Sequence, residues 1–471
     1  MSGLHCIDSV DVMAPARRRG ERTRHTGTRR RTGGAGRLVG VVVLLLACSG
    51  TPGGTACTAA VAAPLELVET FPVETSLDHP DLPEADTVWI EMIESARESL
   101  DFAEFYASNR PGSRLEAVVR AVEAAAERGV HVRFLAGERF YATYPETLER
   151  LAARDGITMR RYDVASLMGG VLHAKYFLVD GRELYVGSQN FDWRALEHIQ
   201  ELGVRVRVAS IVAAFADVFE TDWALAGGAD PATRVVRHAA GATFPVRVVM
   251  PAAAGDGAGA ADTLAVTPVF SPRDWLPDPS LWDLPRLIEL IHGARSTLDV
   301  QLLGYRTVGR DGTYWDQIES ALRRAAARGV QVRLLLADWS KRPGTIEGLQ
   351  SLQVLPGIEV RLLSIPAWSG GFIPFARVAH AKYMVVDAAR AWIGTSNWER
   401  GYFHESRNAG LIIEAAGAGE ATGEAAGGRA GAPAAGSLPA RLQAYFVSGW
   451  QSPYAAPVDA CAEYAVPRIG P

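Results

Sequence analysis

The chain of 471 residues is 48% hydrophobic and 21% charged, which is the composition of a soluble globular protein with enough apolar surface for two domains. The formal net charge is −5, but residues 1–47 hold nine Arg against three acidic side chains, so the rest of the chain carries −11. This charge excludes a global attraction to nucleic acid or anionic membranes, and any site for a polyanion must be a local basic pocket.

Residues 1–63 are predicted to be an export leader with a short spacer. The Arg-rich start leads into the apolar run LVGVVVLLLA at 38–47, which is too short to cross a bilayer comfortably and is typical of a secretory signal. The residues that follow fit lipidation of Cys48 as in a bacterial lipoprotein or ordinary cleavage after Ala62, with an uncleaved anchor as a lesser alternative. We therefore expect an exported protein, either secreted or attached to a membrane through Cys48.

The remainder of the chain contains an internal repeat of a helix followed by a buried strand. Residues 91–102 recur as 289–300, and the helix, glycine and strand at 115–137 recur as 315–338. This order is typical of an α/β domain in which helices cover a sheet. The repeat predicts two homologous domains at 64–230 and 271–471, a linker with some strand at 231–270, and a low-complexity insertion at 415–436.

Each half also carries the same polar residues at the same spacing. In both halves an aspartate follows the motif histidine by 7 residues and an asparagine follows it by 17. A histidine and a lysine two positions apart on an extended segment project from one face, which suits a phosphoryl group. The two sets predict one phosphodiester held between two histidines; they are His173, Lys175, Asp180, Ser188 and Asn190, and His380, Lys382, Asp387, Thr395 and Asn397.

Acidic residues near these motifs have different expected roles. A catalytic histidine needs a partner that selects its tautomer, and Glu201 and Glu405, which lie 28 and 25 residues after their histidines, are the candidates, with a plain surface glutamate as the alternative. Asp180 and Asp387 differ in parity from the histidines, so on a continuous strand they face away from the site. We expect structural salt bridges from them.

Aromatic residues and cysteines add weaker signals. Tyr106 and Tyr305 end the repeated first strand, where α/β sheets place ligand sites, and they are candidates for base stacking, with burial in the core as the alternative. The four cysteines show no spacing typical of structural zinc, and Cys461 is expected to be an incidental thiol.

The motif segments GVLHAKYFLVD and GSQNFDW in the first half, and HAKYMVVD and GTSNWERGYF in the second, resemble the doubled histidine–lysine–aspartate signature of the phospholipase D superfamily. Within it they are similar to the animal lysosomal single-strand 5′-exonucleases and their poxvirus envelope relatives. The resemblance implies two domains of the phospholipase D type, each with a mostly β-sheet core flanked by helices, packed with pseudo-two-fold symmetry.

The resemblance also implies a reaction without metal or cofactor. One histidine attacks phosphorus to form a phosphohistidine; the other protonates the leaving oxygen and later deprotonates the water that releases the product. By position, His173 and His380 are the catalytic pair, and Glu201 and Glu405 orient their rings. Phosphate oxygens are expected to be held by Lys175, Lys382, Asn190 and Asn397, with Ser188 and Thr395 assisting.

We expect an exported phosphodiesterase that acts on single-stranded nucleic acid or on phospholipid. A phospholipase D or a transphosphatidylase similar to cardiolipin synthase is the alternative within the same chemistry, because the motif recognises only the phosphodiester. A non-catalytic lipid-binding scaffold is the alternative from another class, and the completeness of both motifs argues against it. The motif leaves open which histidine attacks and the oligomeric state.

Overall fold

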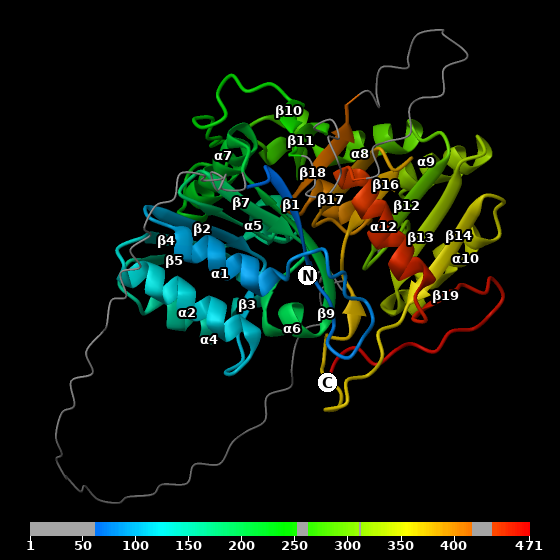
Figure 1. Ribbon diagram of the computed structural model, residues 1–471, viewed down its shortest axis with the longest axis horizontal. Helices are drawn as coiled ribbons and strands as arrows, with labels where there is room; N and C mark the ends of the chain where they lie inside the picture. The colour runs from blue at the N-terminus through cyan, green and yellow to red at the C-terminus, as the bar shows by residue number, and fades with distance from the viewer. Residues whose placement is uncertain (1–61, 252–261, 310–311, 417–435) are drawn as a thin grey trace, which may run out of the picture. The chain divides into compact units, whose positions relative to one another are not determined.

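The computed structural model describes residues 62–251, 262–309, 312–416 and 436–471 (Figure 1). The predicted leader with Cys48 and most of the predicted insertion at 415–436 lie outside these residues. Cys461 is exposed and unpaired with another cysteine. No helix in the described part of the chain is long and apolar enough to cross a membrane.

The first half forms a mixed sheet in the order β1-β9-β7-β6-β2-β4-β5. Pairs along β1 to β2 are antiparallel, and β2, β4 and β5 are parallel to one another. A two-stranded pairing of β3 with β8 lies outside this order. The strands are β1 (Leu65–Thr70), β2 (Ser99–Glu104), β3 (Ala107–Ser108), β4 (His131–Gly137), β5 (Ile157–Tyr162), β6 (Tyr176–Val179), β7 (Glu183–Gly187), β8 (Phe191–Asp192) and β9 (Ile199–Val206).

The second half repeats this sheet in the order β10-β11-β18-β17-β16-β12-β13-β14-β19. Its central seven strands, from β11 to β14, correspond one by one to the first sheet, and β10 and β19 extend the two edges. The predicted linker therefore contributes two strands to this sheet. The strands are β10 (Val246–Val249), β11 (Thr263–Ser271), β12 (Thr297–Leu302), β13 (Gln331–Ala337), β14 (Ile358–Leu363), β15 (Val378–Ala379), β16 (Tyr383–Val386), β17 (Arg390–Gly394), β18 (Asn408–Ala415) and β19 (Ala455–Pro457).

Helices cover the sheets because their apolar residues recur every three or four positions. In α2 (Arg114–Glu127), Leu115, Val118 and Val122 are buried, and the chain leaves the helix at Gly129, whose φ of +93° favours glycine. α9 (Gln317–Ala327) ends in the same way at Gly329. The two glycine stops predicted from the sequence are confirmed.

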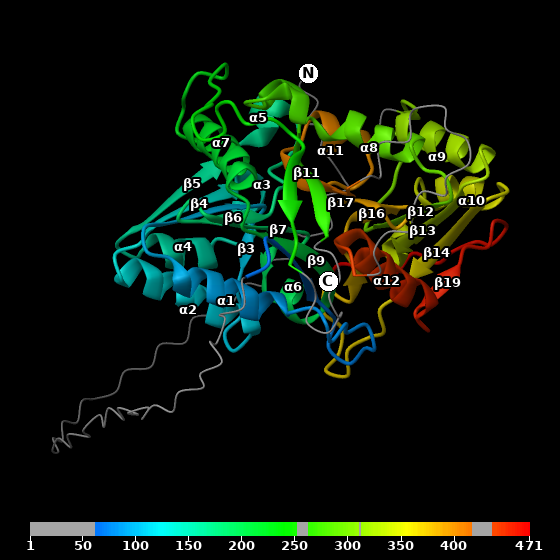
Figure 2. The same cartoon turned by 45° about the horizontal axis from the view of Figure 1, so that its top comes forward.

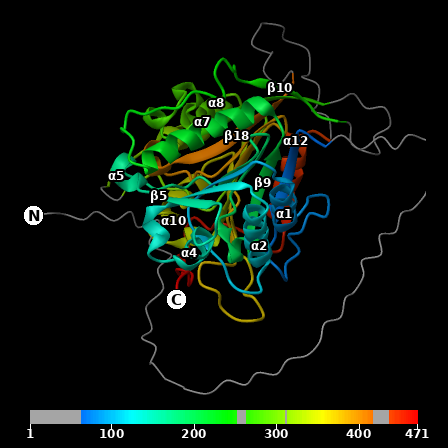
Figure 3. The same cartoon turned by 90° about the vertical axis from the view of Figure 1, so that its left-hand side faces the viewer.

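The helices lie on both faces of the sheets. In Figure 3, α1 and α2 lie on one side of the first sheet and α7 on the other. The helices are α1 (Ala85–Ser95), α2, α3 (Glu138–Tyr141), α4 (Glu146–Ala152), α5 (Val164–Met168), α6 (Trp193–Glu197), α7 (Ala209–Ala226), α8 (Asp283–His292), α9, α10 (Ile346–Gln353), α11 (Arg400–His404) and α12 (Leu438–Gln451), with the short 3₁₀ helices η2 (Arg273–Trp275), η3 (Pro279–Leu281) and η4 (Asp338–Lys341).

One hydrophobic core joins the two halves. It contains Phe215 and Phe219 of α7 together with Tyr383 of β16 and Phe446 of α12. The strand β15 of the second half pairs in parallel with β9 of the first. The strand β7 packs beside β17 (Figure 2) and also beside β18. Because residues of both halves are buried in one core, the interface between the halves, called the seam below, is a fixed part of the fold.

Candidate active site

The two motif histidines lie just before equivalent strands, β6 and β16, and the opposite half holds the backbone of each. The backbone N–H of His173 donates to the carbonyl of Arg407 at 2.8 Å, and that of His380 donates to the carbonyl of Gln200 at 2.8 Å. Arg407 and Gln200 occupy equivalent positions beside β18 and within β9. Each half therefore positions the histidine of the other across the seam.

The orienting partner of each ring comes from the opposite half, not from the half of the histidine itself as the sequence analysis predicted, and the two partners differ. The Nδ1 of His380 lies 2.8 Å from a carboxylate oxygen of Glu201, which is fully buried. The Nδ1 of His173 lies 3.0 Å from the Oδ1 of Asn408. One imidazole thus faces a carboxyl group and the other a neutral amide.

The prediction that Glu405 orients a histidine is wrong. Its carboxylate is partly exposed and binds Arg400 at 2.6 Å, while Asn408 occupies the position beside His173. Asn408 follows His380 by 28 residues, which is the spacing of Glu201 after His173. A search for an equal spacing, without requiring a carboxylate, finds Asn408 from the sequence.

The two motif lysines lie close to the histidines. Lys175 and Lys382 are each only 1% exposed, and each donates from Nζ to the carbonyl of its own motif histidine at 2.6 Å. Burial lowers the pKa of Lys175 well below its usual range and that of Lys382 to about 7. An anionic phosphodiester between them would favour the charged form of both, because opposite charges at close range stabilise each other.

Burial also controls the titration of the histidines. It lowers the pKa of His173 and of His380 well below their usual range, and the charges of the two lysines act in the same direction. Burial raises the pKa of Glu201 to about 8 against the attraction of Lys382. The site therefore contains two imidazoles that burial keeps neutral and, beside His380, a carboxyl group that keeps its proton up to about pH 8.

The polar residues after β7 and β17 divide into two roles. Ser188 Oγ contacts the backbone of Leu202 at 3.0 and 3.2 Å. The Thr395 hydroxyl donates to the Oδ1 of Asn408 at 2.9 Å, so it positions the partner of His173. Asn190 and Asn397 line the pocket, and the buried Oδ1 of each has no hydrogen-bond partner in the described part of the structure. The Oδ1 of each is therefore free to accept a hydrogen bond from a ligand.

Both histidines line one pocket of about 620 Å³, its open mouth included. Besides the two motif asparagines, the other side chains that line it were not singled out from the sequence, because they do not belong to the repeated polar motif. One of them, Tyr402, lies edge-on to the His173 ring with 4.8 Å between ring centroids. These additional residues are Phe105, Phe140, Ile199, Leu303, Trp339, Arg342, Phe375, Val378 and Tyr402.

The prediction that Tyr106 and Tyr305 contact substrate is wrong. Each is 2% exposed and packs in the core, and the Tyr106 hydroxyl donates to Asp192 at 2.8 Å. Phe105 lines the pocket in place of Tyr106, because neighbouring residues of an extended chain face opposite sides.

Asp180 and Asp387 lie outside the site, and their main contacts are not the predicted salt bridges. Asp180 accepts hydrogen bonds from the backbone N–H groups of residues 97–99, and Asp387 accepts from those of residues 295–297. Asp387 also lies 3.4 Å from Arg390. The two carboxylates fix the turn that leads into β2 and β12, which is a structural role.

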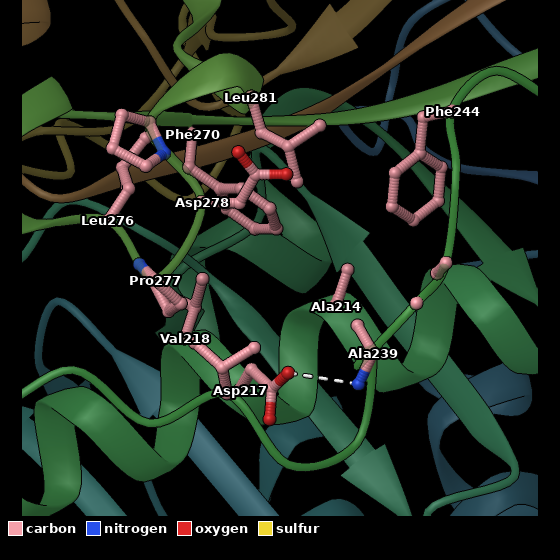
Figure 4. A pocket seen from close by; sticks show the side chains of 14 residues that line it. Ala214, Asp217, Val218, Ala239, Phe244, Phe270, Leu276, Pro277, Asp278 and Leu281 are labelled. Carbon is pink, nitrogen blue, oxygen red and sulfur yellow. Dashed lines mark hydrogen bonds between the residues drawn. The ribbon is translucent and has the colours of Figure 1, made fainter.

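A second cavity, of about 720 Å³, lies between α7 and the segments at 236–244 and 276–281 (Figure 4). Most of the side chains that line it are apolar. The carboxylate of Asp217 accepts three backbone N–H groups, from residues 237, 238 and 239, at 2.9 Å each. This cavity contains none of the motif residues. Among the described residues, no group of three or more His, Cys, Asp or Glu side chains is arranged to hold a metal ion.

Comparison with known proteins agrees with this geometry. A family model described as "Cardiolipin synthase, PLD-like domain" matches residues 89–223 and 287–425, one segment for each motif. The 5′-3′ exonuclease PLD3 of Homo sapiens is 31% identical over 427 residues, which cover 84% of this chain and 81% of the relative. Phospholipase D Z of Dictyostelium discoideum is 29% identical over 412 residues, covering 84% and 90%. Among solved structures, phosphatidylserine synthase from Haemophilus influenzae Rd KW20 has a TM-score of 0.50 at 13% identity, covering 79% of this chain and 85% of that one, and this likeness shows the fold alone.

Two duplicated sheets that bring a histidine from each half to one pocket, each with a buried lysine two residues further on, define an enzyme of the phosphodiesterase class. The chain belongs to the phospholipase D superfamily, and it is a phosphodiesterase of that superfamily.

Proposed function

We propose that the protein is an exported 5′-exonuclease that hydrolyses single-stranded nucleic acid through a phosphohistidine intermediate. The observation that carries the chemistry is the single pocket lined by two histidines with unlike partners. Two observations support the choice of nucleic acid: several relatives at about 31% identity are named 5′-3′ exonucleases, and aromatic side chains suited to base stacking line the pocket. Export rests on the Arg-rich and apolar leader in the sequence.

The unlike partners assign the roles of the two histidines. Asn408 Oδ1 accepts the Nδ1 proton of neutral His173, so the lone pair of Nε2 is free to attack phosphorus. The pair of His380 and Glu201 keeps two protons below about pH 8, one between Nδ1 and the carboxyl group and one on Nε2. The Nε2 proton is then available to a leaving oxygen. His173 is therefore the nucleophile and His380 the general acid.

The reaction proceeds in two balanced steps. His173 Nε2 forms a bond to phosphorus while the bond to the leaving oxygen breaks, and that oxygen takes the Nε2 proton of His380. In the second step, a water molecule gives a proton to the Nε2 of His380. The water oxygen attacks phosphorus, and the bond between phosphorus and His173 breaks. Through both steps the two lysines and the two pocket amides stabilise charge on the non-bridging oxygens.

The test is a side-by-side assay in EDTA of 5′-hydroxyl single-stranded DNA, the matching RNA, and phosphatidylcholine vesicles. A circular single strand of the same DNA sequence has no 5′ end and is the matched substrate control. We expect the wild type to shorten both linear strands and to spare the circle, and His173→Ala and His380→Ala to lose this activity. Glu201→Gln should lower this activity, and Glu405→Gln, its matched control, should keep it.

Two results would overturn the proposal. Turnover that persists in both histidine variants would reject the mechanism. Hydrolysis of phosphatidylcholine without any cleavage of the oligonucleotides would instead favour a phospholipase, the activity in the name of the Dictyostelium relative. Transfer to an added alcohol in that assay would identify a transphosphatidylase.

A further inference from the structure

The walls of the pocket that contains the histidines differ on the two sides of the seam. From the first half, the residue after β2 and the short helix α3 contribute Phe105 and Phe140, whose ring centroids lie 4.6 Å apart. From the second half, the loop after β13 contributes Trp339 and Arg342. The first wall is aromatic and uncharged, whereas the second contains a permanent cation.

Arg342 is anchored so that one end of its guanidinium group stays available. Its Nε donates to the backbone carbonyl of Trp339 at 3.0 Å, which fixes the side chain along the wall. Its two Nη atoms form no hydrogen bond or ion pair with a residue in the described part of the chain. Asn397 and Tyr402 line the same pocket. Arg342 is therefore an oriented donor group at the pocket that contains the histidines.

The scissile phosphate does not need this cation. Lys175 and Lys382 already flank the histidines, and both are almost fully buried. Arg342 is more exposed than either and comes from a different loop. A guanidinium group matches phosphate oxygens because its N–H groups form a planar fork. A polynucleotide presents a second phosphate one nucleotide beyond the first, whereas its 5′-hydroxyl end presents only a sugar and a base.

We propose that Arg342 binds the phosphate next to the scissile one on the 3′ side, and that the wall of Phe105 and Phe140 receives the 5′-terminal nucleoside. This inference rests on the proposed exonuclease function and adds a direction to it. The strand would enter with its uncharged end on the aromatic wall and its charged continuation on the cationic wall. Because only the continuation carries a further phosphate, the two walls distinguish the two ends of the strand.

The experiment compares three short 5′-hydroxyl substrates. The dinucleotide TpT has one phosphate, the trinucleotide TpTpT has two, and a third substrate is the trinucleotide with a neutral methylphosphonate at its second linkage. For the wild type we expect kcat/KM to be about 10- to 100-fold higher for TpTpT than for either other substrate, which is the range of one charge-assisted hydrogen-bond site. The difference should lie mainly in KM. In Arg342→Ala the three values should become similar.

Two further variants make the comparison specific. Arg342→Lys keeps the charge but loses the fork, so it should keep part of the preference for TpTpT. Arg324→Ala removes an exposed arginine of α9 and should keep the whole preference. With longer strands, the slope of log kcat/KM against log salt should become shallower by about 0.7 in Arg342→Ala, as expected for one lost phosphate contact on a single strand.

The outcomes separate this inference from the proposed function. If the wild type cleaves all three substrates and the methylphosphonate lowers kcat/KM equally in the wild type and in Arg342→Ala, Arg342 does not bind the second phosphate. An equal loss of kcat/KM on TpT and on TpTpT in Arg342→Ala also overturns the inference, because a general loss of folding or of chemistry explains such a result. If the wild type cleaves no oligonucleotide, the proposed function falls and this inference falls with it.

Discussion

The unlike partners of the two histidines predict an effect of Glu201→Gln that depends on the leaving group. Glu201 is fully buried and its carboxyl group lies 2.8 Å from the Nδ1 of His380. Glutamine has nearly the same shape and retains an oxygen acceptor. It cannot carry the negative charge or exchange the proton that allows His380 to act as an acid.

The size of the effect follows from the bond that is lost. A hydrogen bond to a charged group contributes about 1.5–3 kcal/mol, against about 1 kcal/mol for a neutral one. Weakening the hydrogen bond between residue 201 and His380 by this difference should slow the reaction roughly 3- to 30-fold. Complete loss of general acid catalysis costs about 10²- to 10⁴-fold. For an oligonucleotide, whose leaving group is an alkoxide, we expect kcat to fall about 10²- to 10³-fold in Glu201→Gln.

The assay compares this substrate with bis(p-nitrophenyl) phosphate. Nitrophenolate is a weak base and leaves without a proton, so the first step should need His173 but no acid. Glu201→Gln should release about one equivalent of nitrophenolate per enzyme in a rapid burst, followed by a slow steady state, because His380 must still activate water in the second step. His173→Ala should show no burst.

The pH dependence gives the same test in another form. As the pH rises through about 8, the pair of Glu201 and His380 loses its second proton, so the oligonucleotide kcat of the wild type should fall. The nitrophenolate burst should not fall in that range, and Glu201→Gln should lose the descending limb near pH 8. A burst that is slowed as much as oligonucleotide cleavage, or a burst in His173→Ala and none in His380→Ala, would refute the assignment of roles.

Three further predictions concern stability and metals. Arg407 and Asp222 form a fully buried ion pair at 2.8 and 2.9 Å, so Arg407→Met alone should lower the free energy of unfolding, measured in urea, by about 3–5 kcal/mol. Adding Asp222→Leu should restore part of this loss, and an equal loss in the double variant would contradict the role of the pair. Burial raises the pKa of Glu69 from 4.5 to about 8, so the folded state holds a proton that the unfolded chain releases, and this contribution to stability is lost as the pH rises from about 5 to 8. Glu69→Gln should therefore gain in melting temperature relative to the wild type as the pH rises, and a constant difference between pH 5.5 and 8 would count against it. EDTA should leave kcat unchanged, and a loss of activity restored by a divalent cation would show that a metal takes part.

The repeat and the motif could be predicted from the sequence because both depend on the spacing of residues that lie close together in the chain. Helical and strand periodicities recur at a nearly constant offset, and the glycine stops at Gly129 and Gly329 follow from backbone conformation alone. Two sheets with matching strand order are the consequence. The spacing of the two histidine motifs is equally local, so the sequence identified the residues that line the pocket from the motif strands.

The equal spacing of 28 residues indicates Asn408, but only the tertiary structure shows that Asn408, and not the carboxylate of Glu405, faces His173. Glu405 has the expected chemistry but lies three residues before the position that faces the ring, and β18 brings Asn408 there by pairing in register with β17. The aromatic and cationic walls depend on the structure for the same reason. Phe105, Phe140 and Arg342 come from the segments that follow β2, β4 and β13. These segments form one pocket only after the two sheets pack, and such contacts leave no regular spacing in the chain.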